Sequence, residues 1–168
     1  MNTSAATVPA TFGNPALRGV LLGGFCAGLA DFLYPTIATV MAGGPWTRPW
    51  KGVASGLFGI AAHQGGMGMV VLGIALHFFI CIVAATLLYL IASRLTWLPR
   101  HWFVLGILYG IAFLAVMNYV ILPLSAIGHG IYPLNTIHVS AFTHILVVGW
   151  PTAFFVSRAL RQTAGGNL

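Results

Sequence analysis

Four long runs of apolar residues dominate the chain and restrict what it can fold into. They extend from Leu17 to Met41, from Met67 to Ser93, from Trp102 to Leu124 and from Thr136 to Leu160. A helix needs about 20 mainly apolar residues to cross the hydrocarbon core of a bilayer, and each run meets that length. Only 5% of the 168 residues are charged, against about 25% in soluble domains. We therefore predict an all-α membrane protein with four transmembrane helices in a single bundle over residues 17–160.

The segments outside the four runs are short, with one exception. Residues 1–16 are rich in Ala, Thr, Pro and Asn and are expected to form a flexible N-terminal tail. Residues 161–168 are expected to form a C-terminal tail. The connection between the first two runs contains WKGVASGLFGIAAHQGG, whose apolar part is too short to span. This pattern predicts a short re-entrant or interfacial helix at about residues 50–62.

The distribution of basic residues predicts the orientation. They lie singly at the ends of the apolar runs, which is typical of membrane proteins and not of a face that binds nucleic acid, so no nucleic acid partner is expected. One side of a four-span topology holds five arginines and the other holds two basic residues: Arg18, Arg94, Arg100, Arg158 and Arg161 against Arg48 and Lys51. The positive-inside rule then predicts a multi-pass protein with both termini in the cytoplasm. Trp97 and Trp102 are expected at the inner boundary, and Trp46 and Trp50 at the outer one.

Small residues recur at four-residue spacing within the runs. In lipid, such residues decide where helices pack, because they let two backbones approach closely. The glycines in this pattern are Gly19, Gly23, Gly24 and Gly28 in the first run and Gly106 and Gly110 in the third. They predict a tightly packed bundle, and they are candidate contact faces for a second copy of the chain or another membrane protein. The two cysteines, Cys26 and Cys81, are interpreted as small buried apolar side chains.

The only acidic residue of the chain, Asp31, lies inside the first apolar run. It shares one helical face with Gly24, Gly28 and Pro35, so its carboxyl group is predicted to point into the bundle. Pro35 also leaves the carbonyl group of Asp31 without its helical partner. A carboxylate at this depth costs about 2.5–3.5 kcal/mol on insertion scales, which favours a functional role for Asp31 over a mere contact between helices.

Each of the other three runs carries a strongly polar side chain at a similar depth. With a rise of about 1.5 Å per residue, all of them fall in the outer half of a core about 30 Å thick. The hypothesis is a polar pocket that binds a small ligand or exchanges protons with the periplasmic side, built from Asp31, His77, Asn118 and His144. Three residues on the outer connections are candidate caps of this pocket: His63, Gln64 and His129. The competing interpretation is that Asn118 and the histidines only join helices, at about 0.6 kcal/mol each.

The sequence contains none of the common catalytic or nucleotide-binding motifs, and a single acid excludes paired carboxylates. A non-enzymatic role is therefore favoured, with no catalytic residue assigned. Two alternatives stay open. His77 and His144 could hold a b-type haem, or together with Asp31 a metal ion, in a membrane redox protein. The chain could instead be a structural or assembly subunit.

Three stretches of the chain carry a resemblance. ASGLFGIAAHQGG followed by LGIALHF, and later MNYVILPLS, resemble a widespread group of small bacterial four-helix inner-membrane proteins, over most of the chain from Leu17 onward. A looser similarity is to the YagU-type (DUF1440) inner-membrane proteins, one of which is linked to acid resistance. The resemblance implies four spans in a bacterial inner membrane, and it brings no catalytic residues with it.

Overall fold

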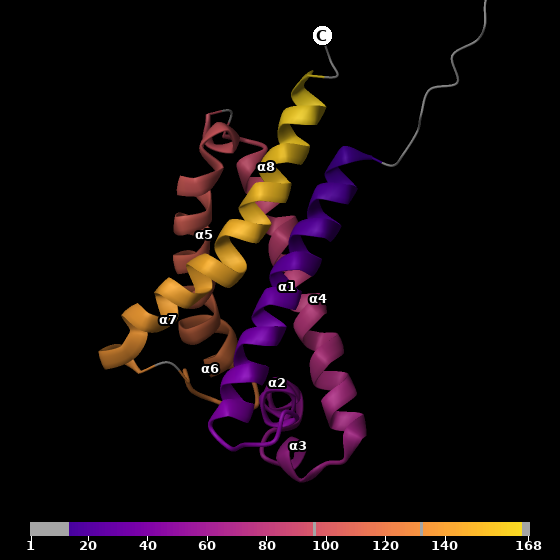
Figure 1. Cartoon of the computed structure of the whole chain (residues 1–168), viewed down its shortest axis with the longest axis vertical. Helices are drawn as coiled ribbons and strands as arrows, with labels where there is room; N and C mark the ends of the chain where they lie inside the picture. Colours follow the sequence, from indigo (N-terminus) through magenta and orange to yellow (C-terminus); the bar gives the residue numbers. More distant parts are fainter. Residues whose placement is uncertain (1–13, 96, 132, 166–168) are drawn as a thin grey trace, which may run out of the picture.

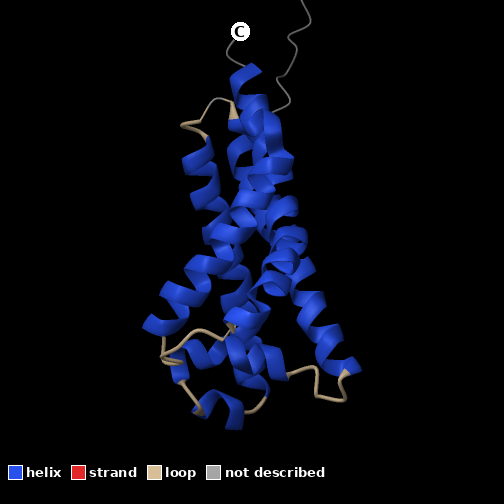
Figure 2. Ribbon diagram, turned by 90° about the vertical axis from the view of Figure 1, so that its left-hand side faces the viewer, coloured by secondary structure: helices blue, strands red, loops and turns tan. Residues whose placement is uncertain are grey.

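The computed structural model describes residues 14–95, 97–131 and 133–165, and within them every regular element is a helix (Figures 1 and 2). Four stretches are long and apolar enough to cross a membrane: Pro15–Met41, Met67–Ala92, Leu98–Leu124 and Ile137–Thr163. Each has 26 or 27 residues, which corresponds to about 40 Å of helix and exceeds the hydrocarbon core of about 30 Å. The predicted all-helical class and the four predicted apolar helices are confirmed.

The four stretches comprise more elements than the four uninterrupted helices that were expected. The first is α1 (Pro15–Met41) and the second is α4 (Met67–Ala92). The third is made of η1 (Leu98–His101), α5 (Trp102–Val116), η2 (Met117–Ile121) and α6 (Leu122–Leu124). After the turn η3 (Leu134–Thr136), the fourth is made of α7 (Ile137–His144), η4 (Ile145–Gly149) and α8 (Trp150–Gly165). Two short helices, α2 (Arg48–Phe58) and α3 (Ala61–Gln64), lie in the connection after α1.

Two π-helical turns interrupt the third and fourth stretches, and each ends two residues before a proline. The N–H of Leu122 donates to the carbonyl of Met117, and the N–H of Trp150 donates to the carbonyl of Ile145, five residues earlier in each case. The next residue is Pro123 in one case and Pro151 in the other, and neither has an N–H to continue the α-helical ladder. A π turn inserts one residue into the helix and is a known way to accommodate such a break.

The connection after α1 is folded against the bundle. Its first helix, α2, is Arg48–Phe58, and the break before α3 falls at Gly59, whose φ of 58° suits glycine. The N–H of Ala126, in the loop after α6, bonds to the carbonyl of Gly56 at 2.9 Å and fixes the two connections together. A helix is therefore present close to the predicted range 50–62, and its re-entrant or interfacial position stays a prediction.

Helix α1 lies between α4 and α8, as Figure 1 shows. Its glycines lie at both contacts. A Cβ on Gly19 would overlap the side chain of Ala159 in α8, and one on Gly24 would come within 2.8 Å of the Cα of Ile82 in α4. A Cβ on Gly106 of α5 would overlap the ring of Trp150 in α8. The backbones approach closely at these positions because no side chain intervenes.

The two ends of the bundle differ in character. The first turn of α1 and the last turn of α8 lie at one end, and α2 and α3 lie at the other (Figure 1). An aliphatic core fills the end near the chain termini, and it consists of Leu88, Ala92, Leu98, Leu105, Ala153, Val156 and Leu160. The acidic residue and the histidine of α4 lie further along, toward α2.

Candidate functional site

Asp31 lies on the face of α1 that packs against α4. One turn earlier, a Cβ added to Gly28 would meet the ring of Phe78 at 2.8 Å and the Cβ of Cys81 at 3.5 Å. The carboxylate group is therefore held beside α4 by the close approach at Gly28 and Gly24, in the way that their helical spacing predicts. It remains 24% exposed, so it is not sealed inside the protein.

The structure brings His77 of α4 to this carboxylate. Nδ1 of His77 lies 3.9 Å from Oδ2 of Asp31, and the side chain of His77 is 9% exposed. This separation is within ion-pair range but exceeds a hydrogen bond by about 1 Å. The two groups are therefore close enough to form an ion pair when the ring is protonated, and a small rotation of either side chain would bring them into a hydrogen bond.

The other ring nitrogen of His77 determines where its proton lies. Nε2 is 2.9 Å from the carbonyl oxygen of Gly28. A carbonyl only accepts hydrogen bonds, so Nε2 carries a hydrogen and donates it. Cys81 Sγ is 4.0 Å from the same nitrogen, and this weaker contact does not compete. In the neutral ring Nδ1 then has a lone pair, and that lone pair faces the carboxylate of Asp31.

Two acceptors facing each other in a place with little water require a proton between them. The proton is either on Asp31, which then donates to the neutral ring, or on Nδ1, which then forms an ion pair with the carboxylate. In both arrangements the pair as a whole is uncharged. Loss of the proton would leave one negative charge within the span, at a cost of several kcal/mol.

Aromatic rings enclose the pair. The indole ring of Trp50, from α2, stacks on Phe32 at 4.3 Å between ring centroids and meets the ring of His77 edge-on at 5.3 Å. Phe78 lies edge-on to His77 at 5.4 Å. Trp50 is 1% exposed, so the expectation that it marks the outer lipid boundary is wrong. Its place is due to Gly73 of α4, where a Cβ would overlap the Trp50 carbonyl.

Sequence reasoning did not assign these rings to the site. Phe32 and Phe78 each follow a predicted polar residue by one position, which offers no signal of a shared contact. Trp50 belongs to a separate helix, and only tertiary packing brings it here. Its Nε1 is buried and has no hydrogen-bond partner among the described residues, which is uncommon for a buried donor.

The other two predicted pocket residues, Asn118 and His144, are also buried. His144 ends α7, and its Nδ1 donates to the Ser140 carbonyl at 2.7 Å. Asn118 lies in η2 and is 3% exposed. It packs against Gly130, where a Cβ would come within 2.6 Å of the Asn118 side-chain oxygen. The structure therefore brings Asp31 and His77 together, and a pocket that they share with Asn118 and His144 stays a prediction.

The three candidate caps are exposed, and their hydrogen bonds in the described part of the chain go to other residues than the pair. His63 and Gln64 lie on α3, where the carbonyl of His63 accepts from Lys51 Nζ at 3.4 Å. His129 bonds through Nδ1 to the carbonyl of Gly130. Trp50 of α2 occupies the position next to His77 that a cap would take.

The residues suggested for a metal ion do not gather. Within residues 14–95, 97–131 and 133–165, no three His, Cys, Asp or Glu side chains are placed so that they could hold a metal. For haem, Nε2 of His77 would have to give up its bond to Gly28, since Nδ1 faces Asp31.

No protein-family model, no curated protein and no solved structure matches the chain. Conclusions about function therefore depend on the geometry of the pair. The resemblance to small bacterial inner-membrane proteins stays an expectation.

Proposed function

We propose that the protein is a multi-pass membrane protein whose Asp31–His77 pair binds and releases one proton. The observation that supports this most directly is the hydrogen bond from His77 Nε2 to the Gly28 carbonyl, because it fixes the ring so that Nδ1 faces the only acidic side chain. A proton carried by this pair is accompanied by no net charge, which suits a site at membrane depth.

The proton exchanges toward the end of the bundle that carries α2. The distribution of Lys and Arg assigns that end to the periplasmic side of a bacterial inner membrane. Asp31 is the more exposed partner, at 24% against 9% for His77, so protons reach the pair through the carboxyl group.

A small ligand or an ordered water beside the pair is a second candidate role for the same site. The buried Nε1 of Trp50, which has no partner among the described residues, favours it. Buried donors in proteins usually find an acceptor, and a trapped water is a common one. An acceptor bound there would lie next to the His77 ring.

Infrared spectroscopy of the purified protein tests the proton site. A protonated carboxyl group has a carbonyl band distinct from that of a carboxylate, and Asp31 is the only acidic side chain. We expect a band that loses intensity as the pH rises, that shifts in D₂O and that is absent in Asp31→Asn. The exposed histidine variant His129→Gln should leave the titration unchanged. A band that does not change with pH, or that persists in Asp31→Asn, would contradict the proposal.

A further inference from the structure

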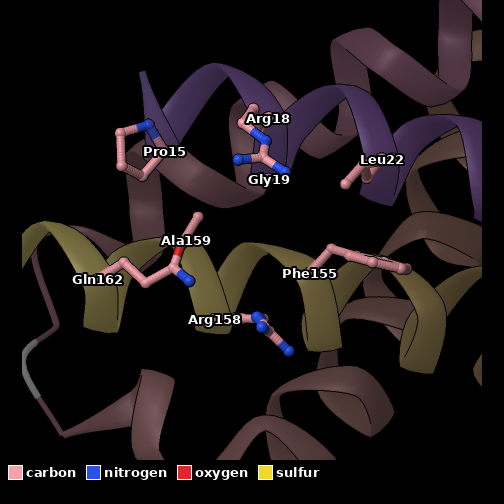
Figure 3. Close-up of a pocket in the computed structure, with 8 residues that line it drawn as sticks. All are labelled: Pro15, Arg18, Gly19, Leu22, Phe155, Arg158, Ala159 and Gln162. Carbon is pink, nitrogen blue, oxygen red and sulfur yellow. The ribbon is translucent and has the colours of Figure 1, made fainter. Parts of the chain in front are cut away.

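A second polar site lies at the opposite end of the bundle from the Asp31–His77 pair. It is a cavity of about 310 Å³ between the first turns of α1 and the last turns of α8 (Figure 3). Its lining consists of Pro15, Arg18, Gly19 and Leu22 from α1 and Phe155, Arg158, Ala159 and Gln162 from α8. Gly19 and Ala159 are where the two helices touch, so the longer side chains form the walls around that contact.

The cavity has an excess of positive charge. Arg18 and Arg158 both line it. The partial positive charge at the start of α1 is opposed by the partial negative charge at the end of α8, so the excess comes from the two arginines. The only acidic side chain, Asp31, is thirteen residues further along α1, about 20 Å away. The two guanidinium groups would attract an anion from the surroundings.

The lining changes from polar to apolar toward the middle of the bundle. On α1 the order from the end inward is Pro15, Arg18, Gly19 and Leu22, and on α8 it is Gln162, Ala159, Arg158 and Phe155, so the polar side chains precede Leu22 and Phe155 on both helices. Leu22 is 43% exposed, so it offers apolar surface to a neighbouring molecule. A phospholipid has the same order, with a phosphate at the boundary and acyl chains below it, whereas a free phosphate ion has no use for the apolar part.

We propose that this cavity binds an anionic phospholipid through its phosphate group. Arg18 and Arg158 supply the charge, Gln162 offers an amide to the headgroup, and the acyl chain lies on Leu22 and Phe155. Basic pockets between transmembrane helices near the cytoplasmic boundary are recognised binding sites for such headgroups. The proposal does not depend on the proton site, which is at the other end of α1.

Native mass spectrometry of the protein in a neutral detergent tests the proposal, with phosphatidylglycerol and phosphatidylcholine as probes. We expect retained phosphatidylglycerol adducts and a clear preference over phosphatidylcholine. The double variant Arg18→Gln/Arg158→Gln should weaken binding of phosphatidylglycerol about thirty-fold, since each basic residue contributes about 1 kcal/mol. Arg18→Lys/Arg158→Lys should keep the preference, because the charge is retained.

The matched control removes two arginines from the same end of the molecule. Arg94 and Arg100 are exposed and do not line this cavity. The variant Arg94→Gln/Arg100→Gln should change binding less than three-fold. Equal binding of the two lipids to the native chain, or an equal loss in the control variant, would overturn the proposal. Displacement of the lipid by millimolar inorganic phosphate would also overturn it, because the site would then be one for the free ion.

Discussion

At the scale of single residues, one carbonyl group gives the Asp31–His77 pair its properties. Gly28 has no side chain, so α4 approaches closely enough for His77 to reach the Gly28 carbonyl. That bond selects the tautomer with hydrogen on Nε2 and leaves Nδ1 for Asp31. In the proposed function, the pair then holds one proton without net charge. A glutamine in place of His77 could keep the bond to Gly28 but could not carry the proton.

This difference leads to a prediction for His77→Gln. Its amide can still donate to the Gly28 carbonyl, so we expect the free energy of unfolding to fall by no more than about 1–2 kcal/mol. His77→Ala leaves a cavity and removes the bond, so the loss should be larger, about 2–4 kcal/mol. Reversible unfolding in mixed micelles gives both values. Equal losses for the two variants would show that the hydrogen bond to Gly28 contributes little.

The sequence predicts only part of this arrangement. The inward direction of Asp31 follows from its spacing to Gly24 and Gly28, and His77 lies four residues from both Gly73 and Cys81 on a similar face. The sequence assigned both side chains to one pocket but did not select His77 over His144 as the neighbour of Asp31, since depth and face do not fix the rotation of one helix against another. Trp50 was assigned to the lipid boundary from its position beside an apolar run. Its burial depends on how the connection after α1 folds, which the spacing of residues does not reveal.

At the scale of helices, the fit of α2 against α4 controls how the pair is covered. The carbonyl of Trp50 lies so close to Gly73 that no side chain can be accommodated there without displacing α2. The stacking of Trp50 on Phe32 connects α2 to α1 as well. A shift of α2 would therefore remove the indole from the His77 ring and expose the pair.

The variant Gly73→Ala tests this fit. We expect it to destabilise the protein by about 1–3 kcal/mol through overpacking, despite the higher helix propensity of alanine. Gly68→Ala, in the first turn of the same helix, is the matched control, since a Cβ there meets nothing within 4 Å. Thermal unfolding of both variants in the same detergent gives the comparison. A loss in Gly68→Ala as large as in Gly73→Ala would argue against a specific contact.

The π-helical turns explain why Asn118 and His144 were harder to place. Counting residues gave their depth, which needs only the rise per residue. Their direction needs an unbroken helix, whereas Asn118 lies inside one π turn and His144 lies directly before the other. The prolines that follow, Pro123 and Pro151, signal an interruption but do not distinguish a kink from a π turn. The predicted pocket of four residues therefore stays a prediction.

At the scale of the whole molecule, the two polar sites lie at opposite ends of one apolar bundle. The cavity with Arg18 and Arg158 lies at the end that carries the chain termini, and the Asp31–His77 pair lies toward α2. Between them the spans expose large apolar side chains over much of their surface. This arrangement suits a bilayer in which one site faces the periplasm and the other faces the cytoplasm.

Cysteine labelling in intact bacterial cells tests the predicted orientation. In a chain without Cys26 and Cys81, the exposed loop residue in Ile131→Cys should react with a membrane-impermeant maleimide added from outside. Gln162→Cys, near the end of α8, should react only after the membrane is made permeable. The reverse pattern would place the chain termini in the periplasm and reverse the side from which the pair receives protons.

Nitrogen-15 NMR of the His77 ring tests the central claim most directly. The other five histidines are distinguished from it by the signals that vanish in His77→Gln. We predict that Nε2 carries a hydrogen at every pH at which the protein is folded. We also predict that Asp31→Asn shifts the Nδ1 resonance and leaves Nε2 protonated. A ring with its only hydrogen on Nδ1, or an Nδ1 signal that Asp31→Asn does not change, would contradict a proton shared by this pair.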